Sequence, residues 1–176
     1  MIERAKVAVV GVGNTISALV QGIALYRSTG SLAGIRRPVL DGLGVGDIDF
    51  VAAFAVSPDK IGTDLAEAIF LPPNNFPRLA GELPLSGVAV QRGLTDATEV
   101  ERVAGQFAGA EVVLYAAPSG RPETARAYAE AALRGERRSS TPHPMRWRAT
   151  GSGWIGLQRR GCLCWVTTWP ASSARQ

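Results

Sequence analysis

Short apolar runs alternate with helical patterns through the first 133 residues. The run at 6–11 (KVAVVG) is rich in β-branched residues and ends at glycine. Such a run is typical of a strand buried on both faces of a parallel sheet. Apolar residues then recur at helical spacing from Ile16 to Ile23. We therefore predict a strand at 6–11 and a helix at 14–27, with Asn14 or Thr15 capping the helix start.

The same alternation continues to residue 133, interrupted by a loop at 29–47 that contains five glycines. It predicts an α/β fold with a Rossmann-like, doubly wound parallel sheet. Ligands in such sheets bind at the carboxyl ends of the strands. Further strands are expected at 48–56, 88–90 and 112–116, further helices at 60–71, 98–107 and 123–133, and the binding edge at 11–14, 55–57, 91–93 and 117–120.

The sequence Gly-Val-Gly-Asn at 11–14 lies between the first predicted strand and its helix. Small residues there let the backbone approach a diphosphate, and the helix N-terminus offers unpaired N–H groups and a positive dipole end. Two of the three glycines of the dinucleotide fingerprint are present, Gly11 and Gly13, while Ile16 occupies the third position. A tight turn without a ligand fits this pattern as well.

Composition excludes several classes of protein. The chain is 46% hydrophobic and 19% charged, which excludes a wholly disordered chain. No apolar run reaches the ~18 residues of a membrane span, so no membrane association is expected. Two cysteines are too few for a disulfide scaffold and favour a cytoplasmic location. Cys162 and Cys164, with His143 as the one histidine, make a poor zinc set, so no metal site is expected.

Residues 134–176 differ in composition from residues 1–133. They hold eight arginines and one acid, Glu136, whereas the first 133 residues hold 11 basic and 14 acidic side chains. All four tryptophans lie after residue 133, and no clean helical or strand period is present there. We expect a nucleotide-binding domain at 1–133 and an irregular, disordered or poorly packed tail at 134–176.

Several runs in residues 5–133 resemble the opening of the shorter, prokaryotic-type myo-inositol-1-phosphate synthases, also called inositol-3-phosphate synthases. The resemblance rests on residues 10–22 (VGVGNTISALVQG), 45–54 (VGDIDFVAAF), 64–75 (DLAEAIFLPPNN), 90–93 (VQRG) and the loop at 118–120, in the family's order. It implies an incomplete Rossmann-like domain. The segment at 94–107 is shorter than is usual in that family.

The resemblance implies an isomerase of inositol and phospholipid biosynthesis that uses NAD as a retained cofactor. Such enzymes convert glucose 6-phosphate to inositol 3-phosphate by oxidation, intramolecular aldol closure and reduction, as homo-oligomers. The catalytic lysines lie in a later half that has no counterpart here, so no catalytic residue is expected and the chain is predicted to be inactive. By position in the family, the cofactor-binding residues are Gly11, Val12, Gly13, Asn14, Thr15, Asn74, Asn75, Pro118, Ser119 and Gly120.

One position departs from the family pattern. The second strand of the family ends at an aspartate that accepts hydrogen bonds from the adenosine ribose, and here that position is Ala55. Losing this acceptor weakens ribose binding, and Ser57 or Asp59 replaces it only in part. We include Ser57 among the expected cofactor-binding residues.

The tail also matches the family when its codons are shifted back by one base. Residues 165–170 (WVTTWP) then read Leu-Gly, two residues from Asp, Asn, His and Tyr, a Leu, Val or Met, and Ala. Residues 139–144 permit Phe-Val-Asn-Ser-Thr-Pro. Both are motifs that the family carries after this point, in the same order and frame. We hypothesise a frameshift or a sequencing error between about residues 132 and 136.

Other functions remain open at this stage. The chain could be a fragment of another NAD(P)-dependent dehydrogenase, or a non-catalytic nucleotide-binding module with a basic tail. Arginines and tryptophans in the tail could bind nucleic acid, but the shifted motifs favour an out-of-frame tail and no nucleic-acid partner. The expected partner is a small molecule, glucose 6-phosphate.

Overall fold

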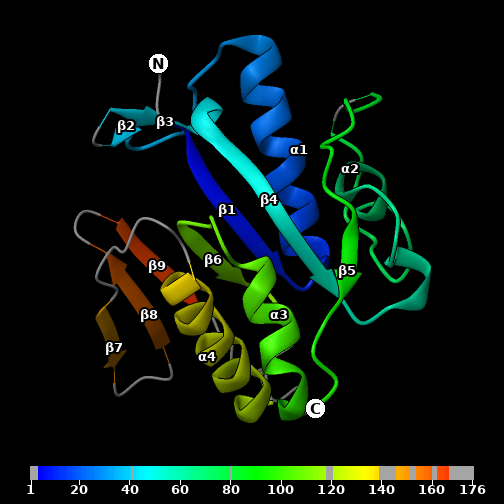
Figure 1. Ribbon diagram of the computed structural model, residues 1–176. Helices are drawn as coiled ribbons and strands as arrows, with labels where there is room; N and C mark the ends of the chain where they lie inside the picture. The colour runs from blue at the N-terminus through cyan, green and yellow to red at the C-terminus, as the bar shows by residue number, and fades with distance from the viewer. Residues whose placement is uncertain are drawn as a thin grey trace, which may run out of the picture.

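The computed structural model describes residues 4–40, 42–79, 81–117, 121–138, 146–150, 154–159 and 162–166. At its centre lies a four-stranded parallel sheet of β1 (Ala5–Val10), β4 (Ile48–Ala55), β5 (Val90–Arg92) and β6 (Val112–Tyr115). The strand order is β5-β4-β1-β6, so chain-distant β1 and β4 pair at the middle of the sheet (Figure 1). This confirms the predicted Rossmann-like α/β fold.

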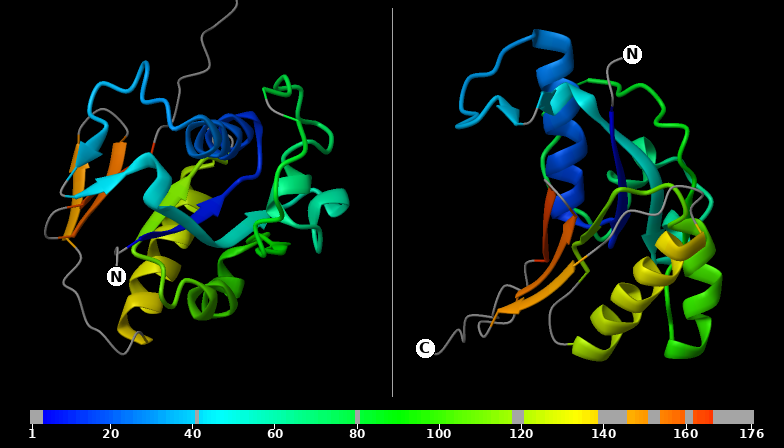
Figure 2. Two further views of the ribbon diagram at one scale, coloured as in Figure 1. Left: turned by 90° about the horizontal axis from the view of Figure 1, so that it is seen from above. Right: turned by 60° about the vertical axis from the view of Figure 1, so that its left-hand side comes forward.

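Helices cover both faces of the sheet, as two views of the molecule show (Figure 2). One face carries α1 (Asn14–Thr29) and α2 (Leu65–Ala68), and the other carries α3 (Val100–Gln106) and α4 (Pro122–Arg138). Strand side chains alternate between the faces because the period of a strand is two residues. Val7 and Val9 therefore pack toward α1, while Ala8 and Val10 pack toward α3 and α4.

Four aromatic rings fill the layer between the sheet and the pair α3 and α4. Phe54 meets Phe107 edge to face, with ring centroids 5.2 Å apart, and Tyr128 lies 5.8 Å from Tyr115. Phe54 and Phe107 are 0% and 2% exposed and Tyr128 is 4% exposed. Burying a large apolar side chain stabilises a fold by roughly 1.5–3 kcal/mol, so this layer anchors both helices.

The predicted helix at 60–71 is wrong in extent. The chain forms a 3-10 turn, η2 (Pro58–Lys60), and only then the short helix α2. Between them, Gly62 has a φ of +89° and donates its N–H to Val90 O, and the Thr63 carbonyl accepts from Val90 N. These long-range bonds occupy backbone groups that a continuous helix would have used. Asp64 then caps α2 by accepting from Ala66 N.

The other predicted elements agree with the structure in type, with small shifts of their ends. A turn, η3 (Ala97–Glu99), precedes α3, and β5 begins two residues later than expected. Gly30, with a φ of +63°, ends α1 and donates its N–H to Tyr26 O. The loop at 29–47 carries the two-residue strands β2 (Val39–Leu40) and β3 (Leu43–Gly44), followed by η1 (Val45–Asp47).

The described residues after α4 form three short strands. These are β7 (Arg146–Thr150), β8 (Trp154–Arg159) and β9 (Cys162–Val166), which pair antiparallel as a separate sheet. The sequence shows no strand period in these segments. The predicted domain boundary at 133 falls within α4, and Cys162 and Cys164 lie in β9, whereas His143 lies outside the described residues.

Candidate nucleotide-binding edge

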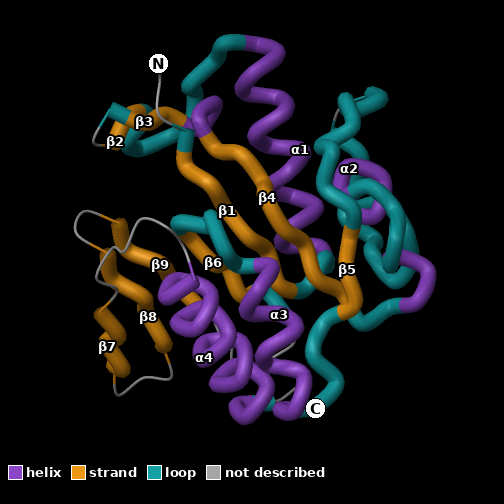
Figure 3. Tube along the Cα trace, in the orientation of Figure 1, coloured by secondary structure: helices purple, strands orange, loops and turns teal. Residues whose placement is uncertain are grey.

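The carboxyl ends of the four parallel strands meet at one edge, where loops leave the sheet (Figure 3). Gly11 donates its N–H to Phe54 O at 2.8 Å, and Gly93 donates to Ala55 O at 2.8 Å. On the other side, Ala116 donates to Val10 O at 2.7 Å. The predicted binding segments after β1, β4 and β5 are thus brought together.

The glycine turn at 11–13 has two different steric requirements. Gly11 has a φ of +91°, and a Cβ there would lie 2.6 Å from Ala117 N, so only glycine fits. A Cβ at Gly13 would meet nothing within 4 Å. Gly11 therefore lets the turn pass close to the loop after β6, while Gly13 leaves its backbone open on the outer side.

The start of α1 is uncapped by side chains, which contradicts the predicted capping by Asn14 or Thr15. The N-cap residue is Gly13, with no side-chain hydrogen bond, and the first turn contains no acidic residue. The first N–H groups of a helix have no partner within the helix and carry its positive dipole end. Asn14 and Thr15 are exposed, so this end faces solvent.

Two residues of the glycine turn and its helix, Val12 and Ile16, are part of the core. Ile16, which replaces the third glycine, is 0% exposed and packs with Val12, Val20 and Leu65. Val12, at 4% exposed, can offer a ligand only its backbone. In the dinucleotide fingerprint the third glycine lets the helix pack closely on the strand. Here the Ile16 side chain fills that position, so α1 packs on the sheet through an apolar side chain.

The Asn14 side chain crosses to the loop after α2 instead of capping its own helix. Its Oδ1 accepts from Asn75 N at 2.9 Å and from Phe76 N at 3.1 Å, and its Nδ2 donates to Asn75 Oδ1 at 2.6 Å. Residues 61 positions apart are thereby joined. These bonds place Asn75 beside the glycine turn.

Lys60 provides a second bridge between the same two loops. Its Nζ donates to Val12 O at 2.6 Å and to Asn74 Oδ1 at 2.7 Å, and the residue is 2% exposed. Asn74 in turn donates its Nδ2 to Ile69 O at 2.8 Å. Burial lowers the pKa of Lys60 below its usual value of 10.5 because desolvation disfavours the ammonium. Sequence reasoning missed this contact, since it depends on a buried lysine 48 residues from Val12.

The end of β4 offers few polar groups. Ala55 is buried, Val56 is 70% exposed, and Ser57 is half-buried with no capping bond from its side chain. Asp59 is exposed in η2. The expected residues Pro118, Ser119 and Gly120 lie outside the described residues.

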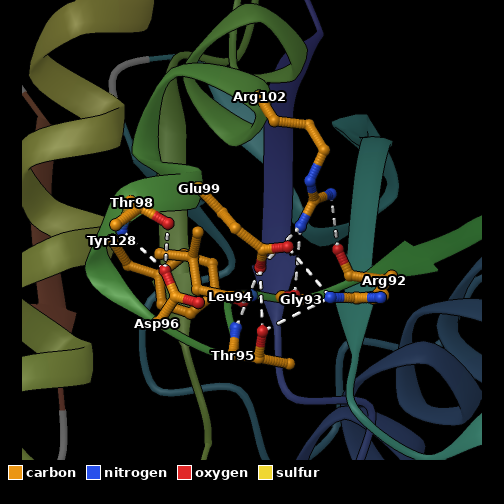
Figure 4. Close-up of polar contacts among 9 residues, drawn as sticks. All are labelled: Arg92, Gly93, Leu94, Thr95, Asp96, Thr98, Glu99, Arg102 and Tyr128. Atoms are coloured by element: carbon orange, nitrogen blue, oxygen red, sulfur yellow. Dashed lines mark hydrogen bonds and ion pairs between the residues drawn. The ribbon is translucent and has the colours of Figure 1, made fainter.

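The loop after β5 is fixed by a polar cluster that Figure 4 shows. Glu99 accepts from Arg92 at 2.9 Å and from Thr95 N at 3.1 Å, and Arg102 donates to the carbonyls of Arg92 and Gly93. The backbone N–H of Thr95 is the main cause that lowers the pKa of Glu99, and the Thr95 hydroxyl and Arg102 lower it further. This cluster fixes the chain at the binding edge, where β5 ends at Arg92 and the following loop begins.

The same loop is tied to the core by an aromatic hydroxyl (Figure 4). Tyr128 Oη accepts from Leu94 N at 2.7 Å, and burial raises the pKa of Tyr128 to about 12. The position of the loop is thus set by α4. For the polar cluster around Glu99, the spacing of Thr95, Asp96 and Glu99 before a helix is the sequence signal that could have indicated it.

A cavity of about 600 Å³ lies away from this edge. It is lined by α1, the start of β4 and residues 83–86.

No helix in the described ranges is long and apolar enough to cross a membrane. Among the residues that the structure describes, no group of three potential metal ligands occurs.

Comparisons with known proteins confirm the resemblance seen in the sequence. The chain is 44% identical to inositol-3-phosphate synthase of Mycolicibacterium smegmatis over 93 residues, covering 51% of this chain and 25% of the relative. It is 36% identical to that of Mycobacterium tuberculosis over 147 residues, covering 73% of this chain and 40% of the relative. No family model matches.

Two solved structures share the fold. The crystal structure of Ari2 matches with a TM-score of 0.71 and 41% identity, over 76% of this chain and 43% of that one. A myo-inositol-1-phosphate synthase-related protein from Thermotoga maritima matches with a TM-score of 0.57 and 17% identity, over 77% and 46%, and supports the fold alone. The chain resembles the N-terminal part of inositol-3-phosphate synthases and spans at most 40% of the curated relatives' length.

Proposed function

We propose that residues 1–133 are the NAD-binding part of an inositol-3-phosphate synthase. The observation that carries this proposal is the glycine turn at 11–13, open at Gly13 and placed before an uncapped helix, in a chain with synthase relatives. A turn of this shape suits a diphosphate, because backbone N–H groups and the helix dipole attract an anion that no side chain displaces.

The residues present fit the diphosphate portion of NAD. Asn14 and Thr15 would hold it through their backbone N–H groups, with Gly11, Val12 and Gly13 shaping the turn and Asn75 lying beside Asn14. NAD would supply a hydride acceptor for sugar oxidation. The chain's contribution is to bind and orient this cofactor.

The adenosine end fits less well. Ala55 offers no acceptor to the ribose, and Val56 exposes an apolar surface beside it. The hydroxyl of Ser57 is the nearest side-chain acceptor along the chain after β4. We therefore propose weak NAD binding in which the diphosphate provides most of the affinity.

The proposal extends to the substrate and the setting. We propose that the substrate is glucose 6-phosphate, that the reaction is its isomerisation to inositol 3-phosphate, and that the chain acts in the cytoplasm. No residue of 1–133 is assigned a catalytic role, because the described lysines, Lys6 and Lys60, lie at the start of β1 and beneath the glycine turn. The 176-residue chain should form no inositol phosphate from glucose 6-phosphate and NAD, and turnover would contradict this part.

Residues 134–176 are proposed to be read out of frame. The support is the pair of family motifs that a one-base shift restores at 139–144 and 165–170. Sequencing of the gene across codons 130–137 tests this, with one inserted or missing base expected relative to the synthases. A continuous, unshifted reading frame shared with close relatives would contradict it.

Binding of NAD to the full chain tests the site. Titration calorimetry should show binding that the variant Gly13→Val abolishes, because a side chain would fill the space where the diphosphate approaches. Gly81→Val is the matched control, since a Cβ there also meets nothing within 4 Å. Equal NAD affinity for all three proteins would refute the proposed site, and circular dichroism would verify that both variants fold.

A further inference from the structure

Lys60 is a buried lysine that forms no ion pair with the residues that the structure describes. Its Nζ contacts a backbone carbonyl, Val12 O, and a side-chain amide oxygen, Asn74 Oδ1, both of which are neutral. None of the ion pairs formed by the described residues includes Lys60. Burying an unpaired ammonium is costly, so its retention at 2% exposure requires a compensating role.

The position of this charge points to the compensating group. Val12 lies between Gly11 and Gly13, so the ammonium binds the middle peptide of the glycine turn from its inner side. The outer side of the same turn is open at Gly13 and continues into the first turn of α1. An anion bound on the outer side would lie across one turn of backbone from the ammonium and would supply the missing negative charge.

The ammonium also fixes the shape of the turn. By holding Val12 O inward it keeps the carbonyl, a negative dipole end, away from the outer side, while Gly13 N donates to Gly11 O at 2.9 Å. Through Asn74 it joins the turn to the loop whose next residue, Asn75, binds Asn14. The two bridges hold both loops in one arrangement before a ligand arrives, which reduces the ordering cost of binding.

We propose that Lys60 is a positioning residue for a diphosphate bound at the glycine turn, acting from behind the turn through Val12 and through its charge. The proposal rests on the proposed cofactor site and adds to it a residue that no glycine motif includes. The ligand class is a nucleoside diphosphate or dinucleotide, and the interaction is with the diphosphate and not with the adenosine.

The test compares ligands with and without the diphosphate. The full chain, Lys60→Met and Lys6→Met are titrated with ADP, NAD and adenosine by calorimetry. Lys6 is the matched control, since it is an exposed lysine at the start of β1, at the other end of the strand. Lys60→Met should weaken ADP and NAD binding about tenfold and leave adenosine binding unchanged.

The outcomes separate the two proposals. If the unaltered chain binds ADP and Lys60→Met binds it with the same affinity, the role of Lys60 is overturned and the proposed cofactor site stands. Equal loss for ADP and adenosine would also overturn it, because that pattern reports a damaged fold. No binding of ADP or NAD by the unaltered chain would overturn both. If Lys60→Met fails to fold, Lys60→Arg is measured instead, since it keeps the positive charge on a longer side chain with a planar guanidinium. It should still bind ADP more tightly than adenosine.

Discussion

Gly93 follows β5 and lies against the hydroxyl of Tyr128, and replacing Gly93 by alanine tests how tightly the two are packed. A Cβ at this position would lie 2.5 Å from Tyr128 Oη and 3.4 Å from Ala55 O. The hydroxyl is held in place, since it accepts from Leu94 N at 2.7 Å and its ring is 4% exposed among other rings. Gly93 is not in the left-handed region, so crowding alone opposes the substitution.

The magnitude follows from the single close contact. Overpacking a filled core costs about 1–3 kcal/mol, and with a hydroxyl that has no room to retreat we expect about 2–3 kcal/mol for Gly93→Ala. Tyr128→Phe removes the acceptor of Leu94 N–H and should cost about 1–2 kcal/mol. In the double variant no hydroxyl opposes the Cβ, so its cost should be close to that of Tyr128→Phe alone. The coupling energy between the two sites then equals the cost of Gly93→Ala alone, about 2–3 kcal/mol.

Urea unfolding of the four proteins, followed by far-ultraviolet circular dichroism at pH 7, gives the four free energies of unfolding. Gly105→Ala is the control, since it is a helical glycine of α3 whose Cβ would meet nothing within 4 Å, and it should be neutral or slightly stabilising. Costs that simply add in the double variant would refute the contact between Gly93 and the hydroxyl of Tyr128.

Three further predictions follow from the same structure. Ala55→Asp restores a carboxylate at the end of β4 and should raise NAD affinity about five- to tenfold in calorimetry; unchanged affinity would place the ribose elsewhere. Burial of Asp64 opposes its ionisation, but bonds from Ser86, Ala66 and Gly87 lower its pKa below 3.8 overall, so the stability it contributes is present above pH 3.8 and lost as pH falls through the lowered value. Asp64→Asn should therefore cost about 1–3 kcal/mol at pH 7 and less at pH 2–3, measured by urea unfolding; an equal cost at both pH values would contradict this. Burial raises the pKa of Tyr128 from 10.0 to about 12. Ionisation of its hydroxyl should therefore lower the free energy of unfolding by about 2–3 kcal/mol between pH 10 and pH 12, with no loss below pH 10. Tyr128→Phe should lack this alkaline decline in thermal unfolding.

Local sequence determined the order of elements and the faces of the sheet. Alternating strand residues such as Val9 and Val10 must point to opposite sides, and helical spacing from Ile16 to Ile23 produces one apolar stripe, so the two-layer core was predictable from period alone. The position of the glycine turn was predictable for the same reason, because a strand end and a helix start leave little freedom between them.

Tertiary structure decided what each polar side chain does. Asn14 has the right chemistry to cap its own helix, yet it binds Asn75 and Phe76, which lie more than 60 residues away. Residues 60–71 have a helical pattern, yet Gly62 and Thr63 pair with Val90 because an edge strand offers them bonds that sequence neighbours do not.

The sequence by itself thus determined the periodic, short-range features of this protein, which are the strands, the helices and the glycine turn between them. Only the tertiary structure decided the long-range polar contacts, such as the bond from Lys60 to Val12, 48 residues away. The physical reason is that hydrophobic periodicity is an average over many residues, whereas a single hydrogen bond depends on which chain segments the fold brings within 3 Å of each other.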